Sequence, residues 1–282
     1  MQHDAGTLRT SDGLTLATRQ WRPHDGAKAA VLLVHGLGEH SGRYAHVATR
    51  LMLADYAVLA YDHRGHGRSE GLPRAYFDRI DLLVRDLGTV LEWARAEGPD
   101  QPLFLLGHSL GGAVAALHVI EHGADDLRGL VLSSAALKLP DAPPPMLRRV
   151  AGFASETFPR LPIARLKLAD LSRDPRTVRA YREDPLTFNG RVPARVGYEL
   201  LRATEQIQAR PEAFRLPLYL FHGTADRITD PDGTRRLYEH AATDDKRLTL
   251  YEGFYHETMN APDTDRQRVL DDLVAWLDAH AE

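Results

Sequence analysis

Ser109 is a candidate nucleophile, because it stands in the pentapeptide G-H-S-L-G at 107–111. Glycines around a serine suit a sharp strand-to-helix turn, in which larger neighbouring side chains would collide. The apolar run 103–106 precedes the pentapeptide, and a helix-like segment, 112–121, follows it. A helix beginning here would direct unpaired N–H groups at the serine oxygen. The pentapeptide also occurs by chance in glycine-rich turns, but its place between strand and helix favours acyl transfer through Ser109.

A base and an orienting acid are expected later in the chain. A serine hydroxyl becomes a good nucleophile when a histidine takes its proton, and an acid holds that histidine in place. In α/β enzymes with such a turn, the acid precedes the histidine along the chain. Asp226 follows the apolar run 218–221, and His256 follows the run 247–251. Both therefore fall at carboxyl ends of predicted strands, and we predict Asp226 as the acid and His256 as the base.

Other histidines and aspartates compete for these roles. Asp230 precedes a proline and fits a helix cap better than a catalytic acid. His118 and His122 have the i, i+4 spacing of metal ligands, but they fall on the helix behind the turn. We therefore expect no metal site and no cofactor.

The segment 35–40, His-Gly-Leu-Gly-Glu-His, follows the first buried strand. Its glycines would let the backbone approach Ser109, so the N–H groups of Leu37 and Leu110 are the candidate oxyanion-hole donors. Phosphate binding is the alternative for such a loop. The chain has no Walker sequence, and 65–70 lacks the last glycine of a dinucleotide fingerprint, so we set nucleotide binding aside.

Composition narrows the class of protein. The 282 residues are 43% hydrophobic and 26% charged, as in a globular protein with a large core, and the formal net charge is −4. This balance gives no reason to expect nucleic acid or an anionic membrane as a partner. The absence of cysteine excludes disulfides, thiolate metal sites and a cysteine nucleophile. With no signal peptide and no apolar run of about 20 residues, we expect a cytoplasmic protein; the oligomeric state stays open.

Short apolar runs alternate with helical patterns, which predicts an α/β fold with a mostly parallel sheet and helices on both faces. Before the first buried strand, two segments around the turn 11–13 predict an antiparallel edge hairpin. The expected buried strands are 30–34, 56–61, 103–106, 130–133, 218–221 and 247–251, and the expected helices are 44–54, 79–96, 112–121, 232–241 and 264–279.

The alternation of strands and helices is interrupted between 139 and 216, where no segment is a convincing strand. Prolines gather at 140–145 and again at Pro217, and helical patterns lie between them. The segment is too long for a plain crossover. We predict a core of residues 1–138 and 216–282 with an inserted helical cap, 139–215.

An apolar stripe at helical spacing lies within the expected cap. It could pack the cap onto the sheet, face a lipid or touch a membrane surface. No basic face accompanies it, so packing is the favoured interpretation and membrane contact the weaker one. The stripe consists of Leu147, Val150, Ala151, Phe153, Ala154 and Phe158.

Taken together, the chain resembles the monoacylglycerol lipase and lysophospholipase-like branch of the α/β-hydrolase fold. The resemblance implies a tunnel for one acyl chain under the cap and a polar pocket for the alcohol. It also implies that Glu39, Arg43 and Tyr181, with His108 beside the nucleophile, shape that pocket; an ion pair of Glu39 with Arg43 that only holds the loop is the alternative. The blocks that carry it are HGLGEHSGRY (35–44), DHRGHGRSEG (62–71), GHSLGG (107–112), YREDPL (181–186), HGTADRITDP (222–231) and YEGFYHE (251–257).

The expected function is hydrolysis of a small lipid ester of the monoacylglycerol type through an acyl-enzyme. A short-chain carboxylesterase and a lysophospholipase are the enzymatic alternatives. A hydrolase fold that binds its ligand without turnover is a more remote one, because a fold does not by itself fix function. Acyl-chain length and preference for 1- or 2-monoacylglycerols are not determined by these motifs.

Overall fold

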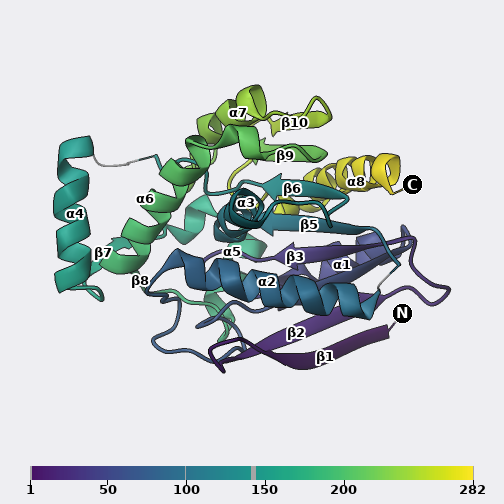
Figure 1. Cartoon of the computed structure of the whole chain (residues 1–282), viewed down its shortest axis with the longest axis horizontal. Coiled ribbons are helices and arrows are strands. Elements are labelled where there is room, and N and C mark those ends of the chain that lie inside the picture. The colour runs from purple at the N-terminus through teal and green to yellow at the C-terminus, as the bar shows by residue number, and fades with distance from the viewer. Residues whose placement is uncertain (1, 99, 141–143, 282) are drawn as a thin grey trace.

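An eight-stranded sheet runs through the centre of the protein, in a computed structural model that describes residues 2–98, 100–140 and 144–281 (Figure 1). Its strands are β1 (Gln2–Arg9), β2 (Thr15–Arg22), β3 (Ala29–Val34), β4 (Tyr56–Tyr61), β5 (Leu103–His108), β6 (Gly129–Ser133), β9 (Leu218–Gly223) and β10 (Lys246–Tyr251). They lie in the order β1-β2-β4-β3-β5-β6-β9-β10. The pairs β1–β2 and β2–β4 are antiparallel and the other neighbours are parallel. The predicted edge hairpin and mostly parallel sheet are thus confirmed.

The central strands are apolar along their whole length because helices cover both faces of the sheet. In β3, Leu32 and Val34 belong to one core cluster, whereas Val31 and Leu33 belong to the cluster on the other face. This alternation follows from the two-residue period of a strand. Every residue of β3, β4, β5 and β9 is buried, which is why these strands appear in the sequence as unbroken apolar runs.

Five helices of the predicted set flank this sheet, each within two residues of its expected ends. Residues of α1 and α8 join the core cluster on one face, and residues of α2, α3 and α7 join the cluster on the other. Their bounds are α1 Ala45–Met52, α2 Ile80–Glu97, α3 Leu110–His122, α7 Pro231–His240 and α8 Asp263–His280.

The chain between β6 and β9 is mainly helical. It also contains a short antiparallel pair, β7 (Pro162–Arg165) with β8 (Arg191–Pro193), where the sequence analysis expected no strand. These strands have four and three residues, and β7 is exposed throughout, so neither leaves an apolar alternation in the sequence. Residues 141–143 of the expected cap lie outside the described part. The helices of the segment are α4 Pro145–Thr157, α5 Pro175–Glu183 and α6 Ala194–Gln208, with single turns at Leu168–Asp170 and Pro211–Ala213.

The expectation that the apolar stripe of α4 packs onto the sheet is wrong. Helix α4 packs on α6, where Gly152 lies against the ring of Tyr198, and it stands apart from the sheet (Figure 1). Helical spacing shows that one face is apolar but not which surface meets it. No helix in the described ranges is long and apolar enough to span a membrane. The stripe residues Leu147, Val150, Phe153 and Phe158 are between 54% and 70% exposed.

Candidate active site

Ser109 occupies the sharp turn that its flanking glycines predict. β5 ends one residue before it and α3 begins one residue after it, and its φ of 52° and ψ of −117° are rare for a residue with a side chain. The chain can turn so tightly because Gly107 and Gly111 have no side chains and let the backbone pack closely. A Cβ on Gly107 would lie 2.6 Å from the carbonyl oxygen of Gly111, and one on Gly111 would lie 2.2 Å from that of Val34.

The three residues predicted for nucleophile, base and acid meet at the carboxyl edge of the sheet. Nε2 of His256 lies 2.9 Å from Oγ of Ser109, and Nδ1 of His256 lies 2.7 Å from Oδ2 of Asp226. Asp226 lies in the loop after β9 and His256 in the loop after β10. All three are at least nine-tenths buried. This arrangement can transfer the serine proton to the imidazole while the carboxylate stabilises the resulting cation.

Asp226 is held as a carboxylate by a dense set of donors. Its Oδ1 accepts the N–H groups of Ile228 and Thr229, at 2.7 and 3.1 Å. Burial alone would raise the pKa of Asp226, but His256 and the hydrogen bond from His222 hold it well below its usual range. Nε2 of His222 lies 3.0 Å from Oδ2 of Asp226. The sequence analysis missed this role of His222, although the residue opens the same HGTAD motif.

The two histidines beside Ser109 have opposite pKa shifts. Burial would lower the pKa of His256, but the Asp226 carboxylate raises it above its ordinary value. Burial, together with His256, lowers the pKa of His108 to about 4. The centres of the two rings are 4.8 Å apart. His108 is therefore neutral near pH 7, and His256 is the group suited to gain a proton during a reaction.

Leu37 and Leu110, the candidate oxyanion-hole residues, both line the cavity that contains Ser109. Leu110 is the first residue of α3, where backbone N–H groups have no partner within the helix. The loop that carries Leu37 lies against the nucleophile, since a Cβ on Gly36 would be 3.1 Å from Cβ of Ser109. The loop conformation is fixed by Glu39, whose Oε1 accepts the N–H of Gly36 at 2.6 Å.

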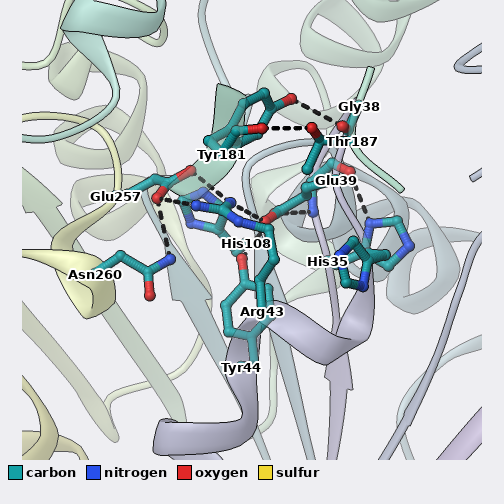
Figure 2. A network of polar contacts seen from close by, with 12 residues as sticks. His35, Gly38, Glu39, Arg43, Tyr44, His108, Tyr181, Thr187, Glu257 and Asn260 are labelled. Carbon is teal, nitrogen blue, oxygen red and sulfur yellow. Dashed lines mark hydrogen bonds and ion pairs between the residues drawn. The ribbon is translucent and has the colours of Figure 1, made fainter. Parts of the chain in front are cut away.

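A buried charge cluster contributes Glu39 and Glu257 to the lining of this cavity, and Figure 2 shows its residues. Nη1 of Arg43 donates to Oε2 of Glu39 at 2.6 Å, so the ion pair considered from the sequence is present. Arg43 also donates two hydrogen bonds to Glu257, at 2.7 and 2.8 Å. Burial would raise the pKa of Glu39, but Arg43 lowers it to about 2. The sequence analysis missed Glu257. Its position directly after the predicted base, His256, was the one feature of the sequence that pointed to it.

Tyr181 joins the expected cap to this cluster. It comes from α5, and its hydroxyl donates to the carbonyl oxygen of Gly38 at 2.8 Å. The guanidinium carbon of Arg43 lies 4.7 Å from the centre of its ring, within range of a cation–π contact. Glu39, His108 and Tyr181 line the cavity that contains Ser109, and Arg43 contacts Glu39 and Tyr181. Figure 2 shows these four residues close together.

The lining of the cavity includes a polar part and an apolar part. It encloses about 610 Å³, including the part open to solvent. Glu39, His108 and Glu257 line it beside Ser109. No group of three or more His, Asp or Glu side chains in the described ranges could hold a metal ion. The apolar lining is made by Ala136, Leu139, Leu166, Leu171, Val192, Leu200 and Ile228.

Comparisons with known proteins agree with this fold and site. The family described as "Serine aminopeptidase, S33" matches residues 25–263. A monoacylglycerol lipase of Mycolicibacterium smegmatis is 35% identical over 271 residues, which cover 95% of this chain and 94% of the relative. The human monoglyceride lipase is 35% identical over 253 residues, 90% of this chain and 83% of the relative. The crystal structure of the Paleococcus ferrophilus monoacylglycerol lipase superposes with a TM-score of 0.80 at 32% identity, covering 99% and 100% of the two chains.

The parallel sheet, the tight turn at Ser109 and the loops after β9 and β10 define an α/β-hydrolase. The matched relatives narrow the class, and the chain belongs to the monoacylglycerol lipase branch of that superfamily. It is therefore a carboxylic ester hydrolase.

Proposed function

We propose that the chain hydrolyses monoacylglycerols to a fatty acid and glycerol through an acyl-enzyme on Ser109. The observation that carries the proposal is the 2.9 Å contact between Oγ of Ser109 and Nε2 of His256 inside a cavity lined by both apolar and polar side chains. The names of the relatives from Mycolicibacterium smegmatis and human support the same substrate.

In the first step, Oγ of Ser109 attacks the ester carbonyl carbon while Nε2 of His256 takes the hydroxyl proton. Asp226 stabilises the imidazolium that forms. The carbonyl electrons move onto its oxygen, which accepts hydrogen bonds from the N–H groups of Leu37 and Leu110. One such donor typically contributes about 3 kcal/mol to the transition state.

The tetrahedral intermediate then collapses. The bond from the carbonyl carbon to the glycerol oxygen breaks, and His256 gives its proton to that oxygen, so glycerol leaves and the acyl group stays on Ser109. A water molecule next loses a proton to His256 and attacks the acyl carbon. The second intermediate releases the fatty acid, and the proton returns to Oγ of Ser109.

Residues 139–215 act as a cap that provides much of the acyl-binding surface. Five leucine and valine side chains of this segment belong to the apolar part of the lining: Leu139, Leu166, Leu171, Val192 and Leu200. Apolar burial of the acyl chain stabilises the complex by roughly 0.8 kcal/mol for each methylene removed from water. Residues 1–138 and 216–282 form the core that carries the reacting groups.

The test is fatty acid release from 1- and 2-monoacylglycerols of graded chain length, with Ser109→Ala in parallel. We expect ready hydrolysis that disappears in the variant, with a chain-length optimum set by the apolar part of the lining. Cleavage of only a small activated ester would instead indicate a short-chain carboxylesterase. Binding without turnover of any ester would indicate a receptor. An aminoacyl p-nitroanilide in the same series tests the aminopeptidase activity that the family description names.

A further inference from the structure

Glu257 contributes a second buried carboxylate to the lining of the cavity. Its side chain is 2% exposed, that of Glu39 is 3% exposed, and that of Arg43 between them is 10% exposed. Both glutamates line the cavity that contains Ser109. When the acyl chain of an ester at Ser109 packs on the apolar side chains of the lining, these two carboxylates are the acidic groups of the lining that remain for its alcohol.

These carboxylates retain hydrogen-bonding capacity. A carboxylate oxygen can accept about two hydrogen bonds. Oε1 of Glu39 accepts from Gly36 and Tyr44, and Oε2 of Glu257 accepts from Arg43 and Asn260. The other two oxygens, Oε2 of Glu39 and Oε1 of Glu257, each accept one described bond, from Nη1 of Arg43. Each can accept one more bond, which two hydroxyl groups of a polyol could donate.

The cluster also carries a net charge of −1, since two carboxylates surround one guanidinium. His108 does not balance it, because burial lowers its pKa to about 4. Within the described part of the chain, no lysine or arginine is among the residues that line the cavity. An additional negative charge brought here would meet repulsion from the two carboxylates, and Arg43 is already paired with both of them.

We propose that Glu257, with Glu39, makes the cavity select ester substrates whose alcohol is neutral and donates hydrogen bonds, and exclude those whose alcohol carries a phosphate. Glu257 is thus a specificity-determining residue. The inference rests on the proposed function and deepens it, because it separates monoacylglycerols from lysophospholipids of the same acyl chain.

The test compares kcat/KM for 1-lauroylglycerol and for 1-lauroyl-glycero-3-phosphoglycerol in identical detergent micelles. The enzymes are the natural chain, Glu257→Gln, and the control Glu252→Gln, an exposed glutamate on the same loop. We expect the natural chain and the control to prefer lauroylglycerol by about 100-fold, since like charges at a binding site cost several kcal/mol. In Glu257→Gln the preference should fall by about tenfold.

The test uses the ratio of kcat/KM for the two lipids. This ratio is informative even if Glu257→Gln is less stable, because both substrates are cleaved by the same folded fraction of the protein. Equal hydrolysis of the two lipids by the natural chain would overturn the selectivity. So would an unchanged ratio in Glu257→Gln. If the natural chain cleaves neither lipid while it cleaves p-nitrophenyl butyrate, the proposed function fails as well, and the two failures are thereby distinguished.

Discussion

The guanidinium of Arg43 holds the carboxylate of Glu257 by two hydrogen bonds, of 2.7 and 2.8 Å, across 214 residues of sequence. Glu257 directly follows His256, and Arg43 also contacts Glu39 on the loop that carries Leu37. One buried side chain therefore connects the loop of the proposed base to the loop of the proposed oxyanion hole. The relative position of these loops depends on it.

Removing Arg43 should destabilise the protein strongly. Arg43→Ala leaves two buried carboxylates without their cation, and loss of one partner of a buried ion pair typically costs about 3–5 kcal/mol. Urea unfolding measures the change. Arg50→Ala is the matched control, because Arg50 pairs with Asp271 at the surface and such pairs contribute about 1 kcal/mol or less. Similar losses of unfolding free energy in Arg43→Ala and Arg50→Ala would contradict a structural role for the cluster.

Activity should decline on the acid side at a pH above the ordinary histidine value of 6.5. His256 must be neutral to take the proton of Ser109, and its pKa is raised by Asp226 despite burial. Activity is therefore present above this pKa and lost as the pH falls through it. The measurement is kcat/KM against pH with a soluble ester. Asp226→Asn should lower the rate by about 10⁴-fold, and an acid limb well below 6.5 in the natural chain would contradict the raised pKa.

The protein should lose stability on mild acidification through a buried histidine cluster beside the loop of Leu37. The ring centres of His35 and His63 are 4.5 Å apart, and those of His35 and His66 are 5.4 Å apart. Burial, with His35, lowers the pKa of His66 to about 3 from 6.5. The unfolded chain therefore binds a proton below pH 6.5 that the folded chain does not, and the stability present above that pH is lost as the pH falls.

At pH 5 the contribution of His66 alone should be about 2 kcal/mol relative to pH 7. Denaturant unfolding at the two pH values measures it. His66→Asn, which retains a side-chain donor for the carbonyl oxygen of Arg64, should show a smaller difference between them. If the variant keeps the full pH dependence, His66 is not the group responsible.

The apolar face of α4 should contribute little to the folded state. Phe153 is 70% exposed, so Phe153→Ala should change the free energy of unfolding by no more than about 0.5 kcal/mol. Phe214, which is fully buried, is the comparison, and Phe214→Ala should cost about 3–5 kcal/mol. Thermal or urea unfolding of both variants measures these changes. A large loss of unfolding free energy in Phe153→Ala would contradict an exposed apolar face on α4.

Much of the sheet and its arrangement around Ser109 could be predicted, because the relevant signals are local. Strands covered on both faces appear as continuous apolar runs, and the turn at 107–111 requires glycines at fixed offsets. The chain order of Asp226 and His256 then follows from their position at strand ends. Contacts between these residues and distant segments could not be predicted. The bond from Arg43 to Glu257, for example, corresponds to no pattern in the sequence of either segment.

Other features escaped prediction for related reasons. The strands β7 and β8 have only four and three residues, too few to show a two-residue period. The face of α4 has the spacing of a packed helix, but whether a surface meets it depends on the path of the chain after β6. His222 lies in a quoted motif, yet its bond to Asp226 follows from the bend after β9.

Covalent labelling tests the assignment of Ser109 most directly. The protein is incubated with an alkyl fluorophosphonate that mimics a monoacylglycerol ester, digested, and mapped by mass spectrometry. The label should occur on Ser109, and its rate of formation should fall sharply in His256→Gln. A label on another residue, or continued ester hydrolysis in a protein whose Ser109 stays unlabelled, would contradict Ser109 as the nucleophile.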